Sequence, residues 1–242
     1  MADALQPRGE NIDWRDQVTW YTHETGLIKV VKLIGGLILP RLIKVECRGA
    51  ENIPATGRCI VASNHINNFD VIFMGLCLPR HPHFMAKKEL YRNPMLAWFI
   101  RLAGSFPINR GEKDPWAMEQ AGRILEAEQL LFMFPEGTRG GRTAQLKRGK
   151  IGAIKLALDH QAPLVPAVIF GTQYLGRGWR GHHPIKIKIG QPLDLAALAG
   201  SPPYEYETVR KLTGLLMQHI AAMLPPAHRG VYAEAIDDED RL

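Results

Sequence analysis

Cysteines are scarce in this chain of 242 residues, and the usual sequence signatures of metal sites are missing. The three cysteines, Cys47, Cys59 and Cys77, are odd in number and fall in stretches expected to form core elements. We therefore expect reduced core thiols in a cytosolic setting. Neither a Cys-x-x-Cys pair nor a His-Glu-x-x-His motif is present, so no metal centre is predicted. Zinc-finger spacings and RNP-type aromatic motifs are absent too, which argues against nucleic acid as a partner.

A long apolar run is also missing. Between residues 26 and 45 the longest uncharged run extends from Leu33 to Pro40, and eight residues cannot cross a hydrocarbon core that requires about 20. Polar and acidic residues fill positions 6–25, so a secretory signal peptide is not indicated. No internal repeat, low-complexity linker or compositional break marks a second domain, and a single domain is the default at this length.

Residues 26–45 nevertheless have an amphipathic pattern. Apolar residues recur at the i, i+3, i+4, i+7 spacing of one helix face, while lysines occupy the opposite side. The apolar positions are Leu27, Val30, Val31 and Ile34, and the basic positions are Lys29 and Lys32. This pattern favours a helix that lies in a membrane interface, with its lysines near anionic headgroups and with Trp14, Trp20 and Tyr21 at headgroup depth. The alternative is a helix packed on the protein's own core, with its lysines in water.

Short apolar segments alternate with amphipathic segments through the middle of the chain. The expected strands are 45–49, 58–63, 83–86, 104–109, 130–134, 164–170 and 185–190. The expected helices are 70–78, 89–102, 115–128, 149–160 and 206–224. The alternation predicts a single-domain α/β sandwich around a mostly parallel mixed sheet. Residues 1–45 would form an N-terminal helical membrane element, 46–226 the main domain, and 227–242 a frayed acidic tail.

A histidine and an aspartate five residues apart, His65 and Asp70, directly follow one of these strands. Along one helix, a step of five residues would direct the two side chains about 140° apart, so they meet only if the chain turns between them. Asn67 and Asn68 supply turn chemistry. A neutral imidazole held by a carboxylate can take a proton from an alcohol, and with no serine supplied the nucleophile would be the substrate's own hydroxyl. The alternative is an aspartate helix cap beside an unrelated histidine.

Three further blocks follow in order, two of them at predicted strand ends. They are Gly104–Arg110 (GSFPINR), Phe134–Arg139 (FPEGTR) and Val165–Val168 (VPAV). Together with the His-x-x-x-x-Asp pair, they resemble the glycerolipid acyltransferase family, most closely the bacterial 1-acylglycerol-3-phosphate acyltransferases, over about residues 45–190. The second block departs slightly from the family pattern at Pro107 and Asn109. The resemblance implies a glycerol-3-phosphate acyltransferase-like fold and makes 46–226 the acyltransferase catalytic domain.

The resemblance also implies a reaction and a set of site residues. An acyl group would pass from an acyl thioester to the sn-2 hydroxyl of 1-acylglycerol-3-phosphate and give phosphatidic acid, with His65 and Asp70 as the catalytic pair. No cofactor is expected, because acyl-CoA or acyl carrier protein delivers the acyl group as a co-substrate. The residues expected to contact substrate are Asn64, Arg110, Glu136, Gly137, Thr138, Arg139 and Lys147.

Individual roles follow within that set. The two arginines would clamp the acceptor phosphate, which guanidinium groups match bidentately. Glu136 would bind the glycerol part of the acceptor or orient an arginine, and Gly137 would permit a tight turn. Backbone N–H groups near the turn at Ile108 and Asn109 would stabilise the oxyanion.

The basic balance of the chain fits such partners. A net charge of +6 suits anionic lipid headgroups, acyl carrier protein and coenzyme A. We expect a peripheral or monotopic protein at the cytoplasmic face of the inner (plasma) membrane, on a surface with anionic lipids, that acts on lysophosphatidic acid. Two alternatives stay open: an acyltransferase for another lysophospholipid or a glycolipid, and a non-catalytic lipid-binding protein of the same fold.

Overall fold

The computed structural model describes residues 13–175 and 183–234. Within these ranges the strands form one seven-stranded sheet in the order β1-β7-β6-β2-β5-β3-β4. Neighbouring strands pair in parallel, except that β6 and β7 are antiparallel. The strands are β1 (Val45–Arg48), β2 (Cys59–Ser63), β3 (Pro82–Lys87), β4 (Ser105–Ile108), β5 (Leu130–Met133), β6 (Leu164–Phe170) and β7 (Ile185–Ile189). The predicted α/β fold with a mostly parallel mixed sheet is confirmed, and each strand ends within one residue of its predicted bounds.

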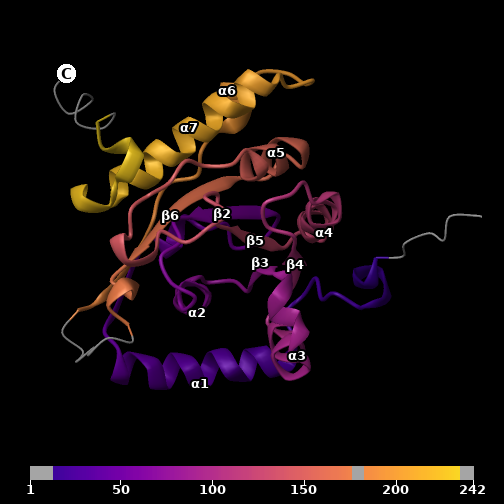
Figure 1. Ribbon diagram of the computed structural model, residues 1–242, viewed down its shortest axis with the longest axis vertical. Coiled ribbons are helices and arrows are strands. Elements are labelled where there is room, and N and C mark those ends of the chain that lie inside the picture. Colours follow the sequence, from indigo (N-terminus) through magenta and orange to yellow (C-terminus); the bar gives the residue numbers. More distant parts are fainter. Residues whose placement is uncertain (1–12, 176–182, 235–242) are drawn as a thin grey trace, which may run out of the picture.

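Helices cover both faces of this sheet (Figure 1). One face carries α4 (Pro115–Glu126), α5 (Gly152–Asp159), α6 (Leu195–Ala199) and α7 (Tyr206–Met223), and the other carries α1 (Gly26–Leu42) and α2 (Asp70–Cys77). The side chains of β2 alternate between two apolar clusters: Ile60 and Ala62 face α4, α5 and α7, whereas Cys59 and Val61 face α2. Burial on both faces explains why the central strands β5 and β6 are continuous apolar runs in the sequence.

The helix predicted over 89–102 is divided in two. A 3-10 helix spans Lys88–Arg92, and α3 begins only at Pro94 and ends at Leu102. Asn93 ends the first segment because a residue before proline disfavours the helical conformation, whereas proline fits the first turn of a helix. The Asn93 side chain then caps α3 by accepting hydrogen bonds from two backbone N–H groups at 3.1 Å. Among the other helices, α5 starts at Gly152 rather than at residue 149, and the short α6 was not predicted.

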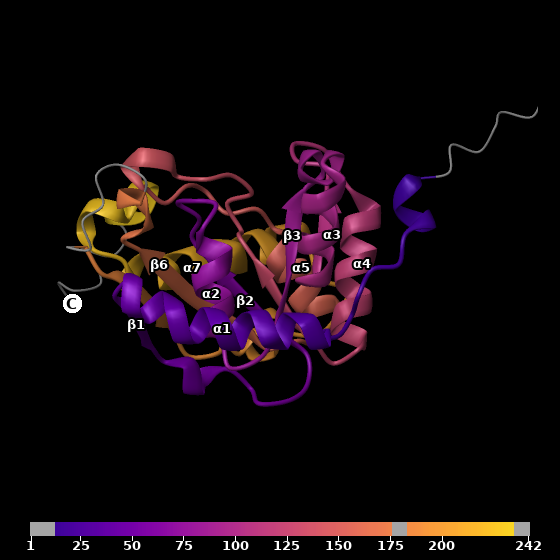
Figure 2. The ribbon, with the colours of Figure 1, turned by 90° about the horizontal axis from the view of Figure 1, so that it is seen from below.

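Helix α1 lies within the expected N-terminal helical segment. Its inner side packs on α2, where Ile28 is buried and Gly35 lies against Leu76. Its outer side leaves apolar side chains exposed, among them Leu27, Val30, Val31, Leu33, Ile34, Leu37 and Ile38. Figure 2 shows this helix in front of the sheet, with α2 behind it. No helix in the two described ranges is long and apolar enough to cross a membrane.

Both ends of the described chain pack more closely than expected. The ring of Trp20 lies edge-on to Tyr91 and Trp116 at centroid distances of 5.6 and 5.7 Å, so it packs against the protein, and its depth in a membrane stays a prediction. At the other end, the tail from residue 227 was predicted to fray, yet Gly230–Tyr232 forms a 3-10 helix and Tyr232 packs against the core beside α7. The acidic residues 237–240 of that tail lie outside the described residues.

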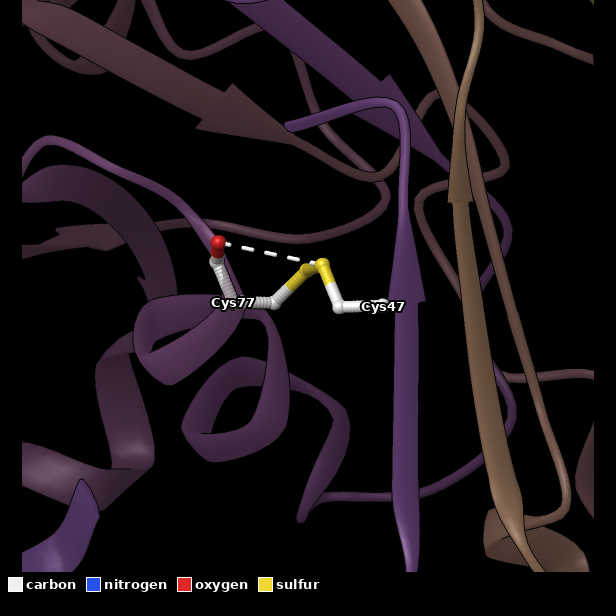
Figure 3. Close-up of a disulfide and its surroundings, with 2 residues drawn as sticks. All are labelled: Cys47 and Cys77. Atoms are coloured by element: carbon white, nitrogen blue, oxygen red, sulfur yellow. Dashed lines mark hydrogen bonds between the residues drawn. A yellow bond between two sulfur atoms is a disulfide. The ribbon is translucent and has the colours of Figure 1, made fainter. Parts of the chain in front are cut away.

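One prediction about cysteine is wrong. Cys47 and Cys77 form a disulfide between β1 and the last residue of α2, with their Cα atoms 6.0 Å apart (Figure 3). Only Cys59 is a free, buried thiol as expected. Cys47 was assigned to the core because it falls in a predicted strand, but β1 is an edge strand and the residue is exposed. The bond joins two segments 30 residues apart and encloses both His65 and Asp70.

Candidate active site

The expected site residues follow strands that end at the same edge of the sheet. Because β2, β5 and β6 run parallel, Ser63 lies next to Ala167 and Ala62 lies next to Met133. The chain leaves these strands into the loops that carry His65, Glu136 and Thr172. Crevices at the carboxyl ends of parallel strands are the usual place for sites in α/β proteins. This edge is therefore the candidate active site.

A turn brings His65 and Asp70 together. The N–H of Asp70 donates to the carbonyl of Asn67 at 3.1 Å, and α2 begins at Asp70. The chain thereby reverses between the two residues, and the Nδ1 atom of His65 lies 2.9 Å from Oδ2 of Asp70. Both side chains are buried. The geometry is the hydrogen-bonded pair that the spacing predicted, at the point where a strand becomes a helix.

The Asp70 carboxylate accepts hydrogen bonds on both of its oxygens. Oδ2 accepts the N–H groups of Ile66 at 2.6 Å and Asn67 at 2.8 Å, in addition to the imidazole. Oδ1 accepts the hydroxyl of Thr172 at 2.7 Å. A carboxylate surrounded by donors is an acceptor, so the network assigns the proton of the neutral imidazole to Nδ1. The Nε2 atom of His65 keeps its lone pair, which makes it the candidate base.

The ring of His65 is also held by packing. It stacks on Phe134 with the ring centroids 3.8 Å apart and the planes inclined by 12°. Phe134 opens the FPEGTR block, so this family block fixes the orientation of the imidazole from the neighbouring strand end. Stacking restricts rotation of the ring about its side-chain bonds, and the hydrogen bond to Asp70 restricts it further.

Glu136 lies beneath the site with its carboxylate used inside the protein. Oε1 accepts the N–H of His65 at 2.9 Å and Oε2 accepts the N–H of Lys147 at 2.8 Å. The side chain is buried, and burial, followed by the negative charge of Asp70, raises its pKa to about 7 against the opposing effect of the two N–H bonds. Glu136 was expected to contact substrate; the structure uses it to join the His65 loop to the 147 loop.

The basic residues of the set lie on the exposed side of the same edge. The guanidinium of Arg139 donates to the side-chain oxygen of Asn68 at 3.0 Å, and the ammonium of Lys147 donates to the carbonyl of Arg139 at 2.8 Å. Lys147 is also 3.5 Å from the hydroxyl of Thr138. The pKa of Arg110 is lowered, first by partial desolvation and second by the positive charge of Arg139. The two guanidinium groups therefore lie close enough to repel each other electrostatically.

Two expected residues shape the backbone. Asn64 is buried, and its side chain exchanges two hydrogen bonds of 2.9 Å with the backbone of Ile169, so it joins the end of β2 to β6. Gly137 has a φ of +65°, a conformation that strains other residues, and its N–H closes a turn on the carbonyl of Phe134 at 3.0 Å. The turn after β5 accordingly has the geometry expected from the glycine.

The turn after β4 does not supply a free oxyanion donor at Asn109. Its backbone N–H donates to Oδ2 of Asp114 at 2.7 Å. Asp114 also caps α4 and accepts two hydrogen bonds from the buried guanidinium of Arg15, at 2.7 and 3.0 Å. Burial alone would raise the pKa of Asp114, but the bonds from Arg15 and the backbone lower it. A chain of contacts thus runs from the N-terminal segment to the turn that carries Arg110.

Sequence reasoning missed Thr172, Asp114 and Arg15. Each reaches its partner over about a hundred residues, 102 for Thr172 and Asp70, and 99 for Arg15 and Asp114. The only local signals are the glycine before Thr172 and the Asp-Pro start of α4. No group of three or more potential metal ligands gathers anywhere in residues 13–175 and 183–234.

Comparisons with known proteins point to one group. Residues 44–170 match the family described as Acyltransferase. A 1-acyl-sn-glycerol-3-phosphate acyltransferase of Bacillus subtilis (strain 168) is 33% identical over 177 residues, which cover 73% of this chain and 86% of that protein. The 1-acyl-sn-glycerol-3-phosphate acyltransferase of Limnanthes alba is 34% identical over 152 residues, but the match covers only 52% of that longer protein.

A solved structure has a similar fold. The crystal structure of the 1-acyl-sn-glycerophosphate acyltransferase PlsC from Thermotoga maritima superimposes with a TM-score of 0.62 and 25% sequence identity. The match covers 81% of this chain and 79% of that one. The sheet and helices that position the candidate site thus have a counterpart in a known lipid acyltransferase.

Proposed function

Because the chain belongs to the acyltransferase family, we propose that it transfers an acyl group from an acyl thioester to the sn-2 hydroxyl of 1-acylglycerol-3-phosphate, with phosphatidic acid as the product. That the protein is an acyltransferase follows from the family. The acceptor follows from the relatives, whose names all specify 1-acyl-sn-glycerol-3-phosphate. The observation that carries the mechanism is the buried His65–Asp70 pair with Nε2 as its free nitrogen.

The pair acts on the acceptor hydroxyl. His65 Nε2 takes the proton as the hydroxyl oxygen attacks the thioester carbonyl, and the C–O bond forms. Asp70 holds the Nδ1 tautomer and stabilises the imidazolium that results. As the tetrahedral intermediate collapses, the C–S bond breaks and the thiol leaves with the proton returned by His65. The acyl group passes directly between the two substrates, so the enzyme contributes proximity and no covalent intermediate.

Arg110 and Arg139 are the proposed clamp for the acceptor phosphate. Their guanidiniums share the edge that carries His65 and lie close enough for the charge of one to lower the pKa of the other. In the described part of the chain neither forms a salt bridge with a carboxylate. A phosphate between them would relieve the mutual repulsion and accept charge-assisted hydrogen bonds from both. Lys147 adds positive charge beside Arg139.

A replacement of His65 tests this mechanism. His65→Ala should abolish transfer, by at least a factor of about a hundred, because the described residues place no other imidazole hydrogen-bonded to a carboxylate at this edge. His219→Ala on the exposed side of α7 is the matched control and should leave turnover unchanged. The assay measures acylated product from purified protein with acyl-CoA and with acyl carrier protein donors, while circular dichroism checks the fold. Near-normal turnover of a folded His65→Ala variant would show that the base is elsewhere.

The two alternatives make different predictions in the same assay. An acceptor other than lysophosphatidic acid would appear as faster transfer to another lysophospholipid or to a glycolipid. A non-catalytic lipid-binding protein would retain lipid but transfer nothing. The intact His65–Asp70 pair favours catalysis, and two neighbouring guanidiniums that form no salt bridge within the described residues favour a phosphate-bearing acceptor.

The proposed location is the cytoplasmic face of the inner membrane, bound peripherally through α1 and α3. Outward side chains of α1 are apolar, with Leu33 65% exposed. Helix α3 adds Met95 and Trp98, which are 77% and 56% exposed, and the two helices meet where the Thr25 hydroxyl lies 3.5 Å from the carbonyl of Leu102. Apolar faces on adjoining helices, one with an indole ring, suit the boundary between headgroups and acyl chains.

A pair of matched substitutions tests the location. Leu33→Asp should weaken co-sedimentation with anionic vesicles, because it places a charge in the proposed contact. Val231→Asp is the control: Val231 is 62% exposed but belongs to the 3-10 helix beside α7, across the sheet from α1. Lys29→Glu should also weaken binding, and salt should reproduce part of its effect, whereas Lys32 already pairs with Glu24 at 3.3 Å. Equal pelleting of the Leu33 and Val231 variants would exclude α1 as the contact.

A further inference from the structure

We infer that Thr172 is a positioning residue for the acyl transfer, and that it acts by fixing the orientation of the Asp70 carboxylate. The inference rests on the proposed function of the His65–Asp70 pair. Thr172 is fully buried and lies in the 3-10 helix Thr172–Tyr174, directly after β6. It belongs to none of the family-like blocks in the sequence, since the VPAV block ends at Val168.

The two carboxylate oxygens of Asp70 have different hydrogen-bond donors, and Thr172 is the donor to Oδ1. Oδ2 receives the imidazole and two backbone N–H groups, all from residues within five positions of Asp70. Oδ1 receives one donor from the described residues, the Thr172 hydroxyl at 2.7 Å. Without it, one oxygen of a fully buried carboxylate would have no partner, and that is costly for a charged group. The carboxylate plane would then be free to turn about its Cβ–Cγ bond and to weaken its bond to Nδ1.

The backbone around Thr172 is built to hold that hydroxyl in place. Asn67 donates from its side chain to the carbonyl of Thr172 at 3.1 Å, so the dyad loop binds the residue at two points. Three residues earlier in each segment, Asn64 and Ile169 exchange the pair of hydrogen bonds described above. Gly171 permits the turn from β6: its φ is +101°, and a Cβ atom there would lie only 2.4 Å from the carbonyl oxygen of Pro184.

The hydrogen bonds to Asp70 come from two separate parts of the chain, its own loop and the segment after β6. The bonds from Ile66 and Asn67 travel with the same loop as Asp70, so they cannot fix that loop against the sheet. Thr172 lies just after β6, whose residues 164–167 pair with β2, and it ties the carboxylate to a separate element. When the hydrogen bonds that orient a side chain come from two elements, motion of one loop changes the orientation of that side chain less than when all the bonds come from a single loop. Thr172 therefore supports the orientation of Asp70, and through it the orientation of His65.

Three variants separate positioning from general stability. Thr172→Val keeps the shape of the side chain and removes the donor, and Thr172→Ser restores the hydroxyl. Thr213→Val is the matched control, because Thr213 is also buried and donates at 2.8 Å, but to the carbonyl of Val209 within α7. We expect Thr172→Val to lower kcat by about tenfold to a hundredfold, the range for a hydrogen bond to a charged group, with little change in KM for either substrate. Thr172→Ser should recover most of the rate, and Thr213→Val should lose stability without losing turnover.

A double-mutant cycle identifies the path of the effect. If Thr172 acts through the Asp70 carboxylate, Thr172→Val should have little further effect on turnover in an Asp70→Asn background, whereas Thr213→Val should stay additive with it. Additive losses for Thr172→Val, or a folded Thr172→Val enzyme with wild-type kcat, would overturn the inference. If Thr172→Val does not fold, Thr172→Ala is put through the same cycle with the same criteria. If the wild-type protein acylates no lysolipid, the proposed function is wrong and this inference falls with it. If the wild type is active and the Thr172→Val variant is unaffected, only this inference is wrong.

Discussion

Glu136 gives the sharpest quantitative prediction, because a buried carboxylate couples stability to pH. Its pKa is raised from 4.5 to about 7, chiefly by burial. In the unfolded chain the group returns to its ordinary value, so between pH 4.5 and 7 the folded state binds more protons than the unfolded state. Stability from this group is therefore fully present below about pH 4.5 and is lost as the pH rises through 7. Integrating the two titrations from pH 5 to pH 8 gives a loss of about 2.5 kcal/mol.

Glu136→Gln removes the titration and keeps the size of the side chain. The substitution also removes one of two acceptors for backbone N–H groups, so the variant should be less stable than wild type at every pH. The informative quantity is the change between pH values. Urea unfolding at pH 5 and pH 8 should show that wild type loses about 2.5 kcal/mol more than Glu136→Gln over this interval.

Other titrating groups do not obscure the comparison. Burial lowers the pKa of both His81 and His83 to about 4, so these histidines favour the folded state more as the pH rises from 4 towards 6.5. That trend has the opposite sign to the effect of Glu136, but it is common to wild type and variant and cancels in the difference. Parallel pH profiles for the two proteins would refute the reasoning and show that Glu136 is ionised at ordinary cost.

Three further predictions concern other parts of the structure. Cys77→Ser should lower the free energy of unfolding by about 3.6 kcal/mol, because the disulfide joins residues 30 positions apart. Reductant should bring the wild-type protein to the same urea midpoint, and three free thiols in denatured, unreduced protein would disprove the bond. Arg110→Ala and Arg139→Ala should each raise KM for lysophosphatidic acid far more than KM for the acyl donor, whereas the control Arg123→Ala on α4 should change neither; equal effects on both substrates would contradict the clamp. Asp114→Asn should cost about 1.5 to 3 kcal/mol in urea unfolding, because it removes one of the two carboxylates that bind the buried guanidinium of Arg15 and leaves Asp13 as the other; a loss below about 1 kcal/mol would mean that the contact with Asp114 adds little to the one with Asp13.

Features set by neighbours in the chain could be predicted from the sequence. His65 and Asp70 lie within one turn, so their spacing and the turn residues between them were enough to predict the contact. The central strands β5 and β6 were predicted within a residue because both faces of the sheet are covered there, which makes each of them a short apolar run. Gly137 was assigned to a tight turn for a reason that is local to one residue, namely its positive φ.

Features set by distant partners could not be predicted in this way. Asn64 and Glu136 were placed in the substrate set through the family resemblance, and that contact stays a prediction; what the sequence did not indicate is that their side chains also bind backbone groups 105 and 71 residues away. The Cys47–Cys77 bond was missed because the cysteine count is odd and β1 gave no sign of lying at the edge of the sheet. The division of the helix at Asn93 was a local error, since the following proline was visible and should have ended the helix.

The disulfide also determines how the protein would carry a mechanical load. Residues between Cys47 and Cys77 form a closed covalent ring, and His65 and Asp70 both lie on it. A force that pulls on the two termini passes through the sulfur–sulfur bond and bypasses the backbone of the ring. The chain on either side can be stretched while the segment that carries the base and its carboxylate stays slack. Reduction would bring that segment into the line of tension and lengthen the extensible chain by the span of the ring.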